Sequence, residues 1–176
     1  MGEVFRRMTR AAKSSFGAAI CVASLFLLLP PAYGDSPQVV GWVEKACIQP
    51  AQLVLPAKVD TGAVTCSLHA PDLIEFERDG EKWVIFTIVD GSGKAAVIEK
   101  KIIGVRRIKR HFGQFQNRPV VRLAICVGNI HKTSEVNLVD RTGFEYPLLI
   151  GRNFMNDSLI VNPSATYTVE PSCADN

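Results

Sequence analysis

The stretch LVLPAKVDTGA, residues 53–63, decides the fold of this chain. Its apolar, β-branched first part predicts a strand, which feeds a tight turn that holds up the carboxylate of Asp60. Gly62 permits a close backbone approach that a β-carbon would obstruct. The Thr61 hydroxyl is able to hydrogen-bond to a neighbouring loop, and Ala63 keeps the exit of the turn free of bulk. We therefore expect one carboxylate to be presented at the end of a strand.

A second motif follows some ninety residues later, at residues 148–154, which read LLIGRNF. The apolar run predicts a strand that ends at Gly151-Arg152 and leads into a short helix. Together the two motifs resemble the two halves of a retropepsin-like aspartic protease. The resemblance implies that Asp60 is catalytic, that Thr61, Gly62 and Ala63 form the active-site loop, and that Gly151 and Arg152 support it.

This chemistry uses two carboxylates that share one proton, because two like charges a few ångström apart cannot both ionise. The chain holds a single Asp-Thr-Gly, and the nearest second candidate, Asp140-Arg141-Thr142-Gly143, has an extra residue. A working pair would therefore require two chains that meet about a two-fold axis, each contributing its Asp60. We expect a homodimer that acts on a peptide or protein substrate, and an inactive monomer.

The resemblance extends along nearly the whole chain after residue 34. It is carried, in order, by residues 41–44, 57–63, 67–70, 118–121, 138–141 and 146–152. This series is similar to a bacterial family labelled as ATP-dependent zinc proteases, which is retropepsin-like in fold. The residues support neither zinc nor ATP. The only histidines, His69, His111 and His131, lack metal-ligand spacing, and Gly91-Ser92-Gly93-Lys94 lacks the rest of a P-loop. We expect no metal and no cofactor, and a structural, hydrogen-bonding role for His69.

One position departs from the retroviral pattern. Retroviral relatives have an acid directly after Asp-Thr-Gly-Ala that pairs with the arginine of the Gly-Arg turn, whereas this chain has Val64. Arg152 therefore needs another partner, and both Asp157 and Asp140 are candidates.

The first 34 residues predict a secretory signal peptide. Arg6, Arg7, Arg10 and Lys13 precede an apolar run at residues 16–29, which is shorter than the roughly 20 residues of a membrane span. We expect export, with the periplasm as the compartment, and no membrane span after cleavage. Removal of the peptide lowers Lys plus Arg from 20 to 16 and Asp plus Glu from 17 to 16, so the mature chain is near neutral. That charge balance argues against a nucleic-acid partner.

Four cysteines remain after residue 34: Cys47, Cys66, Cys126 and Cys173. In an exported chain they permit two disulfides in three possible pairings, which the sequence does not separate. Buried thiols are the alternative, above all for Cys126 within an apolar run.

Short strands with turns every eight to twelve residues predict an all-β, retropepsin-like closed barrel of one lobe, completed by dimerisation. The domain is expected at residues 35–170, followed by a flexible tail at 171–176. We expect a turn at residues 67–71, a helical turn at 153–157, and strands at residues 39–43, 53–59, 73–76, 83–89, 94–103, 106–110, 119–127, 134–139, 144–150 and 159–161.

Two hairpins compete for the role of a flap that closes over the substrate. Their tips lie at residues 91–93 and 112–117. We favour the second, with Phe112, Gly113 and Phe115, because its distance from Gly151 matches the retropepsin layout. The functional alternative to a protease is a module on the same fold that binds a peptide or envelope partner without hydrolysing it.

Overall fold

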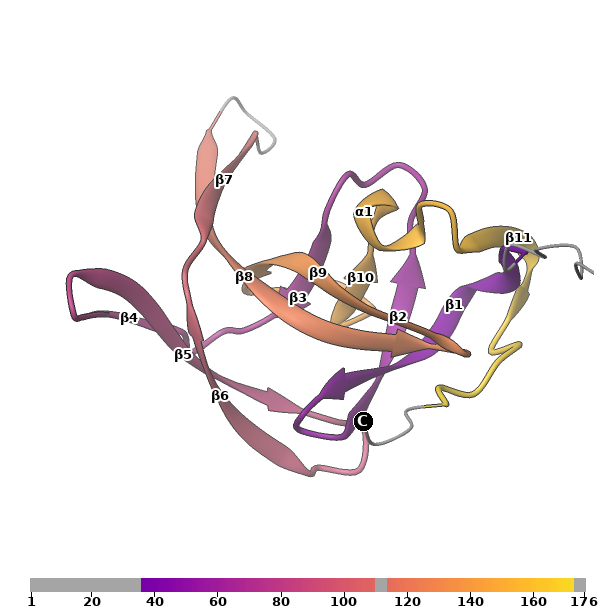
Figure 1. Ribbon diagram of the computed structural model, residues 1–176, viewed down its shortest axis with the longest axis horizontal. Coiled ribbons are helices and arrows are strands. Elements are labelled where there is room, and N and C mark those ends of the chain that lie inside the picture. The colour runs from indigo at the N-terminus through magenta and orange to yellow at the C-terminus, as the bar shows by residue number, and fades with distance from the viewer. Residues whose placement is uncertain (1–35, 110–113, 173–176) are drawn as a thin grey trace, which may run out of the picture. The chain divides into compact units, whose positions relative to one another are not determined.

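The computed structural model describes residues 36–109 and 114–172, in which strands predominate and one four-residue helix occurs (Figure 1). The elements are β1 (Gln38–Gln49), β2 (Leu53–Val59), β3 (Cys66–His69), β4 (Ile74–Arg78), β5 (Glu81–Val89), β6 (Ala95–Lys101), β7 (Gly104–Lys109), β8 (Phe115–Val127), β9 (Ile130–Val139), β10 (Leu148–Ile150), α1 (Arg152–Met155) and β11 (Leu159–Thr166). In this part of the chain no helix has the length and apolar character needed to cross a membrane.

Eight strands form one sheet in the order β11-β1-β2-β10-β3-β9-β8-β7. A further pairing joins β1 to β8, so six strands, in the order β1-β2-β10-β3-β9-β8, close into a barrel. We call the β1–β8 pairing the seam. It consists of the residue pairs Cys47↔Cys126, Ile48↔Ile125 and Gln49↔Ala124. The predicted all-β closed barrel is confirmed.

Alternation along the strands builds the barrel core. On β1, Ala46 and Ile48 belong to the core, and on β8 Leu123 and Ile125 do. Each fully buried aliphatic side chain of this size stabilises the fold by about 1.5–3 kcal/mol. The helix α1 is too short to be stable alone. It is held because Phe154 and Met155 are buried in the same core.

The strands β4, β5 and β6 form a separate sheet in that order. Val84, Phe86 and Ile88 on the inner face of β5 join the barrel core, whereas Ile74 and Val97 on the outer face are exposed. This sheet contains the hairpin with the turn at residues 90–94, the first of the two flap candidates.

The turn predicted at residues 67–71 is wrong in its first part, because residues 66–69 form the strand β3. Pairing with two neighbouring strands overrides the local turn preference of these residues. Leu68 lies opposite Leu148 of β10 on one side and opposite Leu138 of β9 on the other. The predicted signal peptide, residues 1–34, lies outside the described residues, as does residue 35. Within the predicted tail, Ser172 N–H donates to the carbonyl oxygen of Gly128 at 2.7 Å, and residues 173–176 are not described.

Candidate active site

The Asp60 loop leaves β2 at one end of the barrel. The Asp60 N–H donates to the carbonyl oxygen of Ile150 at 2.9 Å, and the Asp60 carbonyl accepts from Ala63 N–H at 3.1 Å. The carboxylate oxygen Oδ1 accepts from Gly62 N–H at 3.0 Å. A β-carbon on Gly62 would lie 3.2 Å from that oxygen, a tight contact that would require the carboxylate to shift by a few tenths of an ångström. The Asp60 side chain is fixed by its own loop and remains 28% exposed.

The turn after β10 clamps this loop through the backbone. Arg152 N–H donates to the carbonyl oxygen of Ala63 at 2.9 Å, and Asn153 N–H donates to that of Val64 at 3.0 Å. The Asn153 side chain adds a third bond, since its Oδ1 accepts from Cys66 N–H at 3.1 Å. The start of α1 therefore satisfies its unpaired N–H groups on the Asp60 loop itself.

Gly151 makes this close approach possible. A β-carbon there would lie 2.5 Å from the carbonyl carbon of Thr65, a separation that side-chain carbons essentially never show. Only glycine allows the two segments to pass at this distance.

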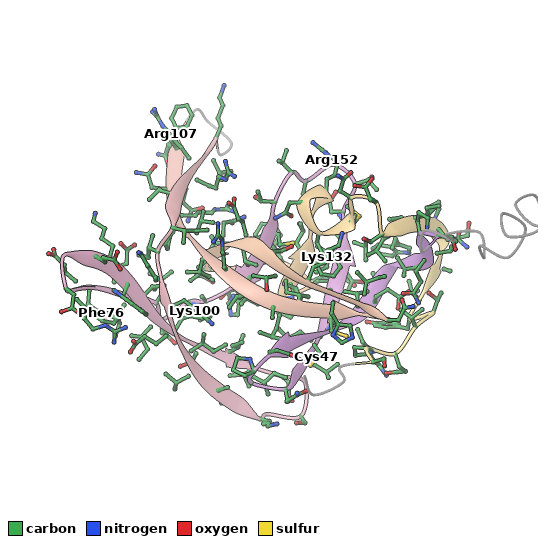
Figure 2. All side chains as sticks on the ribbon, in the orientation of Figure 1. Cys47, Phe76, Lys100, Arg107, Lys132 and Arg152 are labelled. Atoms are coloured by element: carbon green, nitrogen blue, oxygen red, sulfur yellow. The ribbon has the colours of Figure 1, made fainter. Side chains whose placement is uncertain are left out.

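Arg152 extends along the same loop (Figure 2). Its Nη1 donates to the carbonyl oxygen of Thr61 at 2.8 Å. The partner of Arg152 is thus the backbone of the Asp60 loop, and the expectation of a carboxylate partner, Asp157 or Asp140, is wrong. The Thr61 carbonyl oxygen is within reach as an acceptor because the Arg152 backbone is already bonded to the same loop at Ala63.

The second candidate aspartate, Asp140, lies in the turn after β9. Its Oδ1 accepts from both the N–H and the hydroxyl of Thr142, at 2.9 and 2.6 Å, and so caps its own turn. His69 Nδ1 accepts from Arg141 N–H at 2.9 Å, the hydrogen-bonding role expected for it. A further charge near the Asp60 carboxylate is Lys58 Nζ, 3.8 Å from Oδ2.

A cavity of about 370 Å³ opens beside the Asp60 loop. Its walls are the loop, the β7–β8 hairpin and the ends of β3, β9 and β10. The lining residues are Ala63, Val64, Thr65, Ser67, Arg106, Ile108, Arg118, Asn137, Arg141 and Leu149. Three guanidinium groups and no carboxylate are among them. Arg106 forms an ion pair with Glu135 at 3.1 Å, so the positive charge of the cavity wall comes mainly from Arg118 and Arg141.

Arg141 is the most buried of these three cations, at 6% exposure. Its Nε donates to the carbonyl oxygen of Tyr146 at 3.1 Å, and its Nη1 donates to Ser67 Oγ at 3.4 Å. Burial lowers the pKa of Arg141, the positive charge of Arg118 lowers it further, and Asp60 opposes both effects. Because an arginine stays protonated in spite of such shifts, two positive charges lie in the cavity wall close to the Asp60 loop.

The β7–β8 hairpin is the flap candidate that borders this cavity, through Arg106, Ile108 and Arg118. Phe112 and Gly113 at its tip lie outside the described residues. Phe115 opens β8 and is 53% exposed, with the Arg107 guanidinium 3.9 Å from its ring centroid. Figure 1 shows this hairpin rising at the same end of the barrel as α1, whereas the turn at residues 90–94 lies at the other end.

Cys66 lies buried directly beneath the loop. Its Sγ accepts from Gly151 N–H at 3.4 Å and lies 3.3 Å from Asn153 Oδ1. Burial raises the pKa of the Cys66 thiol to about 11, which makes it a poor nucleophile at neutral pH. Among residues 36–109 and 114–172, no group of three or more His, Cys, Asp or Glu side chains is placed to hold a metal ion.

Four residues of this site were not assigned from the sequence: Arg106, Arg118, Arg141 and Asn153. Arg118 and Arg141 belong to the series that carries the family resemblance, but nothing in their spacing shows that β8 and the turn after β9 bring them together. Asn153 was read as part of a helix, and its side-chain bond across to β3 depends on tertiary contact.

Residues 39–172 match the family described as "Retropepsin-like aspartic endopeptidase RimB". Curated relatives are named probable α-L-glutamate ligase. That of Shewanella halifaxensis is 34% identical over 129 residues, 70% of this chain and 28% of the relative. That of Desulfotalea psychrophila is 33% identical over 116 residues, 62% of this chain and 24% of the relative. The chain thus spans only about a quarter of the length of these relatives.

Among solved structures, the Legionella pneumophila protein Lpg0085, described as of unknown function, is similar with a TM-score of 0.66 and 36% identity. The similarity covers 78% of this chain and all of the Legionella chain. With the Asp60 loop, its Gly151–Asn153 clamp and the closed barrel in place, these matches lead to one assignment: the chain belongs to the RimB-like family of retropepsin-like aspartic endopeptidases.

Proposed function

We propose that this chain is an exported aspartic endopeptidase that acts as a homodimer. The observation that carries the proposal is the Asp60 carboxylate, held by Gly62 N–H and partly exposed beside a cavity that the β7–β8 hairpin borders. The loop is braced at Thr61, Ala63 and Val64 by the turn at residues 151–153. Such bracing is what a catalytic carboxylate needs, because small displacements of a reacting group cost large factors in rate.

In the proposed mechanism two Asp60 residues, one from each subunit, share a single proton. The ionised carboxylate takes a proton from a water molecule, which attacks the carbonyl carbon of the scissile bond. The protonated carboxyl group donates to the carbonyl oxygen, and the departing amine then receives a proton from the pair. Thr61 and Gly62 are exposed in the single chain and are the residues through which the two loops would meet.

We further propose a substrate with acidic side chains. Arg118 and Arg141 repel each other beside the Asp60 loop, and a bound carboxylate would relieve that repulsion while accepting hydrogen bonds from guanidinium groups. The relatives that contain this region are named as glutamate ligases, which favours glutamate among acidic residues. The peptide would lie extended under the hairpin, with backbone hydrogen bonds to its strands.

The test is cleavage of matched peptide libraries between pH 3 and 8 by the wild-type chain and by Asp60→Asn. One library contains glutamate at several positions and its control has glutamine at the same positions. We expect cleavage by the wild-type chain only, inhibition by a pepstatin-type transition-state mimic, and preference for the glutamate library. Arg118→Gln should reduce that preference.

Three other outcomes would change the conclusion. Equal cleavage by both proteins would mean a different active site or a contaminant. Binding without cleavage would support the peptide-binding module in place of the protease. Cleavage without preference between the libraries would remove the acidic substrate and leave the protease.

A further inference from the structure

The seam of the barrel carries two cysteines that face each other. Cys47 on β1 and Cys126 on β8 are partners in the antiparallel register. Directly opposed residues in such a pair have Cα atoms about 4.5–5.5 Å apart, and a disulfide accepts Cα separations of about 4.4–6.8 Å. The Cα separation expected from this register therefore lies within the range that a disulfide accepts.

Both thiols lie on the same side of the sheet, outside the barrel core. Their neighbours Ala46, Ile48 and Ile125 belong to the core, so the alternation of the strands turns Cys47 and Cys126 to the opposite face. Both are nevertheless buried, with 2% and 1% exposure. The two buried thiols therefore adjoin each other at the seam. Figure 2 shows Cys47 well away from Arg152.

A base adjoins the pair. Nε2 of His131 lies 3.6 Å from Cys126 Sγ, and His131 itself is exposed. A small cavity at this point is lined by Gln49, Cys126, His131 and Lys132, among others. Cys126 also contacts the carbonyl oxygen of Gly128 at 3.5 Å, and Cys47 Sγ lies 3.5 Å from Gln52 Oε1. The cavity provides a route from solvent to Cys126.

We propose that Cys47 and Cys126 are a disulfide-forming pair that closes the barrel covalently at its seam. His131 takes the proton of Cys126, and the thiolate attacks a low-molecular-weight disulfide such as oxidised glutathione. One glutathione thiol leaves, and Cys126 is held as a mixed disulfide. The Cys47 thiolate then attacks that sulfur and releases the second glutathione thiol. Two S–H bonds are exchanged for one protein S–S bond, and one glutathione disulfide becomes two thiols.

This proposal selects one pair among the four cysteines whose pairing the sequence left open. Cys66 lies under the Asp60 loop, bonded to Gly151 and Asn153, on strand β3, which is not a neighbour of β1 or β8 in the sheet. Cys173 lies outside the described residues. A link between Cys47 and Cys126 would span the chain from β1 to β8 and so should raise the melting temperature by roughly 10 °C.

The experiment equilibrates the purified full chain in reduced and in oxidised glutathione, blocks thiols with N-ethylmaleimide under denaturing conditions, and maps tryptic peptides by mass spectrometry. Trypsin places the four cysteines after residue 34 on separate peptides, residues 46–58, 59–78, 123–132 and 153–176, and Cys21 on a fifth, residues 14–45. We expect peptides 46–58 and 123–132 to be joined in the oxidised sample, two hydrogen atoms lighter than their sum. The higher melting temperature should disappear in both Cys47→Ser and Cys126→Ser and persist in Cys66→Ser and Cys173→Ser.

His131→Gln should slow formation of the link and leave the amount formed at equilibrium unchanged. Joining of peptide 153–176 to either seam peptide would overturn the proposal, as would both seam peptides carrying N-ethylmaleimide after full oxidation. A gain in melting temperature that survives Cys47→Ser would do the same.

Discussion

Glu44 is a fully buried carboxylate that ties the C-terminal segment to β1. Its Oε1 accepts from the N–H groups of Gly41 and Thr168, at 2.6 and 2.9 Å, and its Oε2 accepts from Val169 N–H at 3.2 Å. A buried charge is tolerated only where hydrogen bonds replace its lost hydration, and here the backbone supplies them.

The variant Glu44→Gln tests this arrangement. An amide nitrogen must replace one acceptor oxygen and would face backbone donors, so the free energy of unfolding should fall by about 2–3 kcal/mol. Urea denaturation measures the change, with the exposed residue Glu75→Gln as the control. A loss equal to that of the control would show that the carboxylate contributes no net stability.

The Arg152 side chain is exposed and contacts the Asp60 loop, so it should matter for activity more than for stability. Truncation to alanine removes the bond to Thr61 O and leaves the backbone clamp of α1 in place. We expect kcat/KM to fall by about 10–100-fold because the Asp60 loop loses its alignment, with little change in melting temperature. Steady-state kinetics measures the effect, with Lys94→Ala, which removes an exposed cation in the β5–β6 turn, as the control. An activity like that of the control would remove Arg152 from the support of the loop.

The raised pKa of Cys66 gives a pH-dependent prediction. The folded thiol has a pKa of about 11 against 9.0 for an unperturbed thiol, so its contribution to stability is complete below pH 9 and is lost as the pH rises toward 11. In the native protein, Cys66 should resist N-ethylmaleimide at pH 7 and 8 and react in urea. Peptide mapping of residues 59–78 measures this. Rapid labelling of the native chain at pH 7 would contradict the burial of the thiol.

Among the elements, the β7–β8 hairpin is the one that we propose as the flap over the substrate. Phe115 is half exposed on it, so truncation to alanine should cost little stability and remove a contact to the bound peptide. We expect KM to rise several-fold, with kcat nearly unchanged. Val97→Ala, an exposed apolar residue on β6, is the matched control. A Phe115→Ala variant with wild-type KM would argue against this hairpin as the flap.

At the scale of the whole molecule, the proposed dimer makes a quantitative prediction. When wild-type and Asp60→Asn chains are mixed, unfolded together and refolded, mixed dimers hold one intact carboxylate and should be inactive. At equal amounts, activity should be about one quarter of that of the same total amount of wild-type protein, since only wild-type pairs act. Activity near one half would mean that each chain acts alone.

The sequence predicted the barrel and the Asp60 loop because both depend on local patterns: a β-branched strand, a turn and alternating burial. It did not predict the pocket cations, because Arg106, Arg118 and Arg141 come from β7, β8 and the turn after β9, and only the sheet order brings them together. The partner of Arg152 was missed for a related reason. A carboxylate was expected as the partner because of its opposite charge. The observed acceptor is the backbone carbonyl of Thr61, and no sequence pattern indicates such an acceptor.

The strand β1 lies between β2, β8 and β11, and its parallel partner β11 is almost the last element of the chain. Gln38 lies opposite Leu159, 121 positions further on. Contacts of such sequence separation make folding slow, because a long loop must close before they form. During synthesis β1 therefore cannot pair with β11 until residue 159 has been added. A chain that ended before Leu159 would lack the parallel partner of β1. The sheet around β1 is therefore completed only after residue 159 has been synthesised.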